Sequence, residues 1–254
     1  MHQLRLFFIA LQFFTRLPIP RWVGFDPDWL HQSSRYFPAV GIVVGAVAAA
    51  VYAIAALCWP PLVAVLLSTS AGIWLTGAFH EDGFADACDG LGGGMTRQRV
   101  LEIMTDSRIG AYGAIGIGLL LALKCAALAS MPVRSVLAAL LLAHPLSRLA
   151  ATALIWRLDY AKSEGKSKPL AQRMSGAEFA VATLSVLFVV AGAAIAGWLS
   201  WQAITAGVAA VALLAWWLAR KFVLRIGGYT GDCLGAVQQV TEAGFYLAVL
   251  AVAR

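Results

Sequence analysis

Two long stretches without a charged side chain constrain this sequence more than any other feature. The first lies between Arg35 and Glu81, and the second lies between Glu178 and Arg220. Each stretch is long enough for two membrane-spanning helices of about 20 residues. A pair of prolines divides the first stretch, and a serine flanked by tryptophans divides the second. The sequence therefore predicts four membrane spans in these two stretches.

The composition agrees with a membrane protein, because 61% of the residues are hydrophobic and only 13% are charged. A soluble domain carries about 25% charged residues to cover its surface. Further spans are predicted at Ile109–Met131, Ser135–Trp156 and Leu234–Ala253. We expect an all-α, polytopic membrane helical bundle of about seven transmembrane helices, with residues 1–254 forming a single membrane-embedded domain. Function then belongs to the loops and helix ends.

The basic residues predict the orientation of the chain in the membrane. Of the 19 Lys and Arg residues, only Arg134 and Arg254 fall on the side away from the N-terminus. Lys124 and Arg148 lie within spans, near their ends, where we expect them to snorkel toward water. The positive-inside rule then places the N-terminus and the long loops in the cytoplasm. The net charge of +6 needs no nucleic-acid partner to explain it.

The N-terminal segment Leu6–Phe14 is apolar but too abruptly ended for a signal peptide. Arg16 and two prolines follow at once, and no small-residue cleavage site is present. We expect a retained interfacial helix. Short interfacial or cytoplasmic helices of this kind complete the predicted fold.

Acidic residues are sparse in this sequence, yet six of the 13 fall within one short stretch. Asp82, Asp86 and Asp89 are spaced i, i+4, i+7, which places them on one helical face. We expect that helix to continue the second span. Like charges at this spacing destabilise a helix, so a cation should compensate them. Mg²⁺ prefers a few carboxylates together with substrate phosphates. The six acidic residues are Glu81, Asp82, Asp86, Asp89, Glu102 and Asp106.

A second part of the cluster follows a glycine-rich turn, in the segment from Asp106 to Gly113. Asp106 is a candidate for a fourth metal-binding carboxylate, and Arg108 beside it is a candidate phosphate ligand. The alternative for Asp106 is the N-cap of the next span. These residues predict metal-dependent transfer of a phosphoryl-type group at the membrane surface.

Several segments resemble the cobalamin synthase family, the adenosylcobinamide-GDP ribazoletransferases. Residues 77–90 read Gly-Ala-Phe-His-Glu-Asp-Gly-Phe-Ala-Asp-Ala-Cys-Asp-Gly, and residues 104–110 read Met-Thr-Asp-Ser-Arg-Ile-Gly. This aspartate motif carries most of the resemblance. Residues 14–20 and 37–41 resemble segments that precede this motif in the family, and residues 228–235 resemble a segment that follows it. The resemblance covers nearly the whole chain.

The resemblance implies a reaction that the composition does not. A Mg²⁺-dependent transferase would join adenosylcobinamide-GDP to α-ribazole, or its 5′-phosphate, and release GMP. It implies a multi-pass protein of the bacterial cytoplasmic membrane, with the site on the cytoplasmic side and an association with other enzymes of nucleotide-loop assembly.

Specific roles follow from combining the motif with the residue chemistry. Either Asp106 or Asp86 is expected to be the general base. The expected metal ligands are Asp82, Asp86, Asp89 and Asp106. The expected substrate contacts are Arg16, His80, Arg108, Lys166, Lys168, Thr230 and Asp232.

Two other classes of function remain open at this stage. A CDP-alcohol-type phosphotransferase of lipid metabolism would use similar aspartates, and a panel of substrates separates the two enzymes. A cation transporter is the second alternative, because acidic residues in membrane proteins often mark ion paths. Transporters place such residues near the bilayer midplane, whereas this cluster lies beyond the apolar run.

Overall fold

The computed structural model describes residues 1–24, 26–161 and 174–252, and helices account for nearly all of the regular structure in them. The shorter elements lie at the N-terminus and between the long helices. Their bounds are α1 (His2–Phe14), η1 (Arg21–Val23), α2 (Pro27–Gln32), η2 (Ser33–Tyr36) and α6 (Arg97–Ile103). The longer helices are α3 (Phe37–Ala55), α4 (Pro61–Thr76), α5 (Phe79–Gly93), α7 (Ala111–Ala129), α8 (Val133–Arg157), α9 (Gly176–Ile195), α10 (Trp201–Ile226) and α11 (Gly231–Val252).

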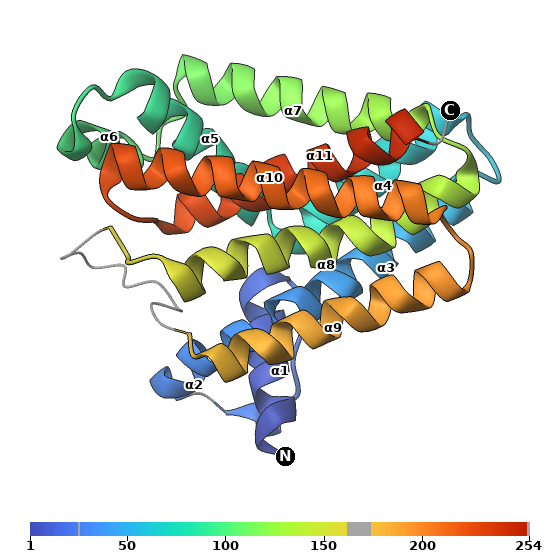
Figure 1. Ribbon diagram of the computed structural model, residues 1–254, viewed down its shortest axis with the longest axis horizontal. Helices are drawn as coiled ribbons and strands as arrows, with labels where there is room; N and C mark the ends of the chain where they lie inside the picture. The colour runs from blue at the N-terminus through green and yellow to red at the C-terminus, as the bar shows by residue number, and fades with distance from the viewer. Residues whose placement is uncertain (25, 162–173, 253–254) are drawn as a thin grey trace.

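The structure confirms the all-α class of an integral membrane protein. Five helical segments are long and apolar enough to cross a membrane, and the pair α4 and α5 makes a sixth if the two form one bent span. The seven predicted spans all coincide with helices, but α11 does not meet this criterion of length and apolarity. Helices α7, α8, α9 and α10 run roughly parallel across Figure 1, and α1 lies crosswise to them.

The acidic helix α5 does not continue α4, so that expectation was wrong. The two helix axes meet at 89°. The corner consists of Gly77 and Ala78, which both have left-handed backbone conformations with φ values of 66° and 60°. Glycine adopts this region without steric cost and commonly ends a helix there, whereas alanine rarely does. The corner turns α5 away from the direction of α4.

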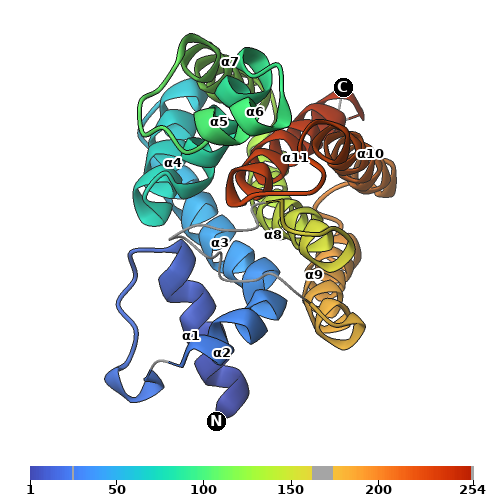
Figure 2. The same cartoon turned by 90° about the vertical axis from the view of Figure 1, so that its left-hand side faces the viewer.

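Helix α11 is central to the packing, because it contacts α5, α7, α8 and α10. Figure 2, a view from one end, shows α5, α6 and α7 grouped together, with α10 and α11 beside them. Glycines permit the closest approaches. A Cβ atom at Gly83 of α5 would lie 3.1 Å from the Cα atom of Asp232, and one at Gly235 would lie 3.0 Å from the carbonyl oxygen of His80. Small residues at helix crossings are typical of membrane bundles.

Polar contacts join the start of α9 to the N-terminal segment. A capping box formed by Ser175 and Glu178 begins α9, and the Glu178 carboxylate also pairs with Arg35 at 2.5 Å. The N-terminal helix α1 packs against α2, η2 and α3. These contacts attach the peripheral N-terminal segment to the bundle.

The crossing of α3 and α8 generates a prediction. A Cβ atom at Gly41 would lie 2.6 Å from the carbonyl oxygen of His144. Backbone cannot yield easily, so Gly41→Ala should lower the free energy of unfolding by about 1–3 kcal/mol. The matched control is Gly118→Ala in α7, where nothing lies within 4 Å of the added atom. The control should gain up to about 1 kcal/mol from helix propensity. Thermal unfolding in detergent compares them, and equal midpoints would contradict this account of the crossing.

Candidate active site

The three aspartates of α5 lie on one helix but in different surroundings. Asp82 is exposed, Asp86 is half-buried and Asp89 is buried. The first two are one turn apart and belong to the same face. The third points into a contact with the next long helix. The motif is therefore divided between an open acidic face and an internal structural contact.

Asp89 holds the start of α7. Its two carboxylate oxygens accept hydrogen bonds from the backbone N–H groups of Gly110 and Gly113, at 2.7 and 2.8 Å. The first N–H groups of a helix have no partners within the helix, so a carboxylate there satisfies them and favours the positive end of the helix dipole. Cβ atoms at either glycine would overlap the Asp89 carboxylate. Close packing thus explains these glycines.

Asp106 is not the N-cap of α7, because that position belongs to Gly110. Its carboxylate instead pairs with the guanidinium of Arg108 through two hydrogen bonds, at 3.0 and 2.7 Å. Both side chains are exposed, and the pairing lowers the pKa of Asp106 to about 2. A carboxylate with such a low pKa is a weak base. The arginine is correspondingly placed at an open surface where an anion can reach it.

The segment that contains Thr230 and Asp232 lies at the same end as the acidic helix. Thr230 is fully buried, and its hydroxyl donates to Asp232 at 3.2 Å and accepts from the N–H of Cys233. The backbone of Asp232 lies against Gly83 of α5. The structure thus brings Asp232 beside the aspartate helix, while Thr230 acts in the local turn at the start of α11.

A short backbone bridge joins this turn to the end of α8. Tyr160 and Tyr229 form an isolated parallel β-bridge, and their rings are 5.5 Å apart. Burial raises the pKa of Tyr160 to about 12, with a further contribution from the charge of Asp232. Lys166 and Lys168 lie outside the described residues. The last described residue before them, Ala161, donates its N–H to the carbonyl of Tyr229 at 2.8 Å.

The two remaining predicted residues lie near the corner between α4 and α5. Arg16 has its backbone N–H bonded to the carbonyl of Leu75, and its guanidinium lies against Gly77. His80 is buried, stacks on Phe14 at 5.2 Å and lines an internal cavity. His80 therefore does not share the open face of Asp82.

The carboxylates do not form a complete metal cage. Among the described residues, no three His, Cys, Asp or Glu side chains converge as metal ligands would. The oxygens of Asp89 and Asp106 hold other groups, whereas Asp82 and Asp86 lie one helical turn apart on the same face of α5. Two carboxylates are sufficient for Mg²⁺ when phosphate and water supply the other ligands.

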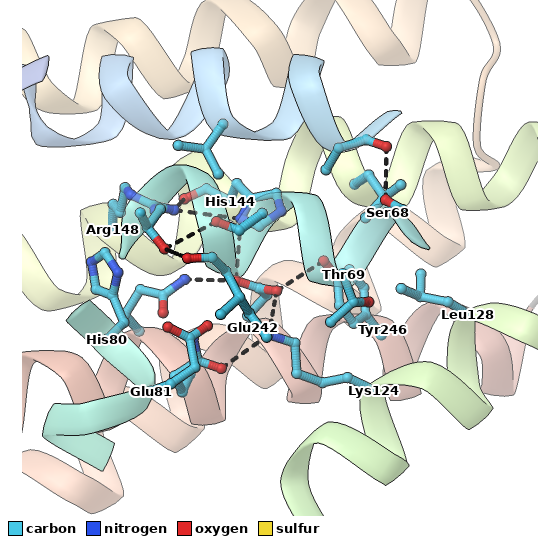
Figure 3. A pocket seen from close by; sticks show the side chains of 18 residues that line it. Ser68, Thr69, His80, Glu81, Lys124, Leu128, His144, Arg148, Glu242 and Tyr246 are labelled. Atoms are coloured by element: carbon cyan, nitrogen blue, oxygen red, sulfur yellow. Dashed lines mark hydrogen bonds and ion pairs between the residues drawn. The ribbon is translucent and has the colours of Figure 1, made fainter. Parts of the chain in front are cut away.

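Sequence reasoning missed a buried polar network in the middle of the bundle, shown in Figure 3. Glu242 of α11 lies at its centre. Its carboxylate pairs with Lys124 of α7 at 2.6 Å and with His144 of α8 at 3.2 Å. It also accepts hydrogen bonds from Gln238 and from the Tyr246 hydroxyl, at 2.6 and 3.0 Å. Glu242 is thus a paired residue that joins three helices.

Lys124 and Arg148 do not snorkel, so that prediction was wrong. The side chain of Lys124 is only 7% exposed and Arg148 is only 3% exposed, and both residues line the same internal cavity. For Lys124 the physical reason is the carboxylate of Glu242, because a buried cation is retained where a counter-charge is within reach. Arg148 donates to the carbonyl oxygen of His144 at 3.1 Å. The i, i+4 spacings of His144 with Arg148 and of Gln238 with Glu242 were the available signal, since each pair shares a helix face.

The network extends to α5 through Glu81. Gln239 is the link, because its side-chain amide donates to Glu81 at 2.8 Å and its carbonyl oxygen accepts from Lys124 at 3.0 Å. The cavity between these groups has a volume of only about 30 Å³. That volume suits one or two waters rather than a nucleotide. The network therefore supports the aspartate helix from inside and is not a substrate pocket.

The apolar helices define an all-α integral membrane protein, and the acidic helix α5 carries its candidate site. Comparison with known proteins gives the family. Residues 6–250 match the family model described as cobalamin-5-phosphate synthase, and the chain belongs to that family. No solved structure gives a significant match.

The relatives are similar along nearly their whole length. A protein of Leptothrix cholodnii is 49% identical over 98% of this chain and 96% of its own. Relatives from Shewanella frigidimarina and Vibrio cholerae are 44% and 41% identical, over 99% and 98% of this chain and 96% and 95% of their own. All three are named adenosylcobinamide-GDP ribazoletransferase. The family resemblance that the aspartate motif indicated is thereby confirmed, and it extends over nearly the whole chain.

The contact of Asp89 with α7 generates a prediction. Asp89→Ala would leave the N–H groups of Gly110 and Gly113 without their acceptors, at a cost of about 1–3 kcal/mol for each buried group. We expect faster hydrogen exchange at those two amides and a lower unfolding temperature. Glu102→Gln, which alters only exposed contacts with Arg99 and Gln98, is the control. Unchanged exchange in Asp89→Ala would contradict the positioning role.

A second prediction concerns Glu242. Glu242→Gln would leave Lys124 buried without its counter-charge, and removal of one partner from a buried pair costs about 3–5 kcal/mol. The double variant Lys124→Met/Glu242→Gln should recover part of that loss, because no uncompensated charge remains. Thermal unfolding of the two single variants, the double variant and the wild type completes the cycle. If the stability lost in the double variant equals the sum of the losses in the two single variants, the two residues act independently.

Proposed function

We propose that this chain joins adenosylcobinamide-GDP to α-ribazole, or to α-ribazole 5′-phosphate, with release of GMP. The observation that carries the proposal is the shared activity name of relatives that are 41–49% identical over at least 92% of this chain. The family match over residues 6–250 supports the same reaction. The product would be adenosylcobalamin or its 5′-phosphate.

The chemistry is a displacement at phosphorus. The ribose hydroxyl oxygen of the acceptor forms a bond to the phosphorus that carries the cobinamide, the bond from that phosphorus to the oxygen of GMP breaks, and GMP leaves. The hydroxyl proton passes to a carboxylate. Asp86 is favoured over Asp106 as this base, because Arg108 holds the pKa of Asp106 at about 2.

Mg²⁺ fits the open pair of carboxylates. Asp82 and Asp86, one helical turn apart, would hold it together with oxygens of the pyrophosphate. When bound, the ion would neutralise charge on the phosphate oxygens. Asp89 would then serve the site by positioning the segment from Asp106 to Gly110, through its hydrogen bonds to the start of α7.

Cationic side chains are proposed to bind the phosphates of the donor. Arg108 is 86% exposed and can exchange its carboxylate partner for a phosphate of similar geometry. In the sequence, Lys166 and Lys168 follow Ala161, whose N–H donates to the carbonyl of Tyr229. Together with Arg16, they are proposed to guide the anionic donor. Catalysis then comes mainly from positioning and charge stabilisation.

The basic residues support an orientation with this end in the cytoplasm of a bacterial cell. The site would thereby meet water-soluble substrates and other enzymes that assemble the nucleotide loop. Transport of cations is not favoured, because the buried carboxylate of Glu242 is already neutralised by Lys124. A CDP-alcohol substrate is not favoured by the names of the relatives.

The test is GMP release from adenosylcobinamide-GDP and α-ribazole by the purified protein in lipid. We expect turnover with Mg²⁺ and none with excess EDTA. Because Asp86 has both proposed roles, Asp86→Asn should lower kcat by at least about 10²- to 10⁴-fold, the usual contribution of a general base, and excess Mg²⁺ should not restore the loss. Asp82→Asn should lose activity that excess Mg²⁺ partly restores.

The control is Glu102→Gln, an exposed residue paired only at the surface, which should keep wild-type turnover. Folding of every variant is checked by its unfolding temperature. A folded wild type that releases no GMP would overturn the proposed function. Turnover of a CDP-alcohol in its place would point to the lipid enzyme.

A further inference from the structure

A second and larger hollow lies between α5, α7, α10 and α11. It is an apolar groove of about 350 Å³, more than ten times the volume of the polar cavity. Phe84, Cys88 and Leu91 form its wall on α5. They follow Asp82, Asp86 and Asp89 by two residues, a rotation of about 200° around the helix. The groove therefore lies on the side of α5 away from the acidic face.

The polar end of this groove has the composition of a membrane interface. Lys221 lines it, and its ammonium nitrogen lies 5.2 Å from the centre of the Trp217 ring. Trp217 and Tyr112, which also line the groove, are more than half exposed. Tryptophan and tyrosine gather at the level of lipid headgroups. Lys221 has no carboxylate partner within 4 Å among the described residues.

The charge at this end selects among possible occupants. Helix α10 contains Arg220, Lys221 and Arg225 and not a single acidic residue. An apolar wall that ends at an unpaired cation matches a molecule with a hydrocarbon chain and a negatively charged head. Basic residues next to a bilayer attract anionic lipids in this way. A neutral lipid would fill the groove but leave the cation without a counter-charge.

We propose that the groove binds one acyl chain of an anionic phospholipid, with the Lys221 ammonium against the lipid phosphate. Trp217 and Tyr112 flank the glycerol region. The chain then packs against the face of α5 opposite Asp82 and Asp86. A bilayer lipid thus becomes part of the wall that supports the acidic helix, independently of which substrate that helix binds.

Cys88 gives a local readout, because it lies in the groove wall and is half-buried. The full-length protein is placed in nanodiscs of phosphatidylcholine, with or without phosphatidylglycerol, and treated with a hydrophobic maleimide. Peptide mass spectrometry then measures the labelling of each cysteine. Cys58, exposed in the turn after α3, is the internal reference. We expect phosphatidylglycerol to slow labelling of Cys88 several-fold and to leave Cys58 unchanged.

Variants at the cation separate selective binding from general lipid contact. Lys221→Gln should abolish the protection by phosphatidylglycerol, and Lys221→Arg should keep it. The matched control is Arg220→Gln, because Arg220 lies over Trp216, which lines a different groove between α8, α9 and α10. In Arg220→Gln, phosphatidylglycerol should protect Cys88 from labelling as it does in the wild type.

Three results would overturn the proposal. The first is equal labelling of Cys88 with and without phosphatidylglycerol in the wild type. The second is full protection in Lys221→Gln. The third is protection that follows protein concentration or added α-ribazole instead of lipid, which would assign the groove to a second copy of the chain or to the acceptor. None of these results depends on turnover, so they leave the proposed function to its own test.

Discussion

The ion pair between Lys124 and Glu242 is the interaction on which the arrangement of this bundle depends. A carboxylate inside an apolar bundle is tolerated only when charge and hydrogen bonds compensate it. Glu242 meets that requirement with partners from α7 and α8 and from its own helix. The position of α11 is thereby fixed relative to both neighbours. Through Gln239 and Glu81, the same network reaches α5, so the interior of the bundle and the acidic face share one support.

Close backbone approach is the second condition for the site. Helix α5 meets the start of α11 at Gly83 and the start of α7 at Gly110 and Gly113. At the first contact, the absence of a side chain brings Asp232 beside the aspartates. At the second, it lets the Asp89 carboxylate reach two backbone N–H groups. Asp89 and Asp232 are therefore each placed by a neighbour that has no Cβ atom.

The sequence predicted the elements well and the internal contacts poorly. Apolar stretches long enough to span a bilayer located the helices, and the spacing of Asp82 and Asp86 located the open acidic face. The corner at Gly77 and Ala78 was not foreseen, because an alanine at positive φ has no sequence signal. The burial of Lys124 was missed because its partner lies more than a hundred residues away, where no local pattern links the two. The hydrogen bonds of Asp89 to Gly110 and Gly113 were not foreseen, because those backbone groups belong to another helix.

Along α5, His80 and Glu81 face the internal polar cavity, and Asp82 faces outward. Adjacent residues in a helix are separated by about 100° of rotation. Turning α5 about its axis by one position would therefore drive an outward carboxylate into the bundle and withdraw an inward group from Gln239. Rotation of α5 is therefore unfavourable, because it would bury the Asp82 carboxylate and break the contact between Glu81 and Gln239. A rearrangement of the bundle then involves the segments around α5, while the acidic face stays in place as a fixed platform.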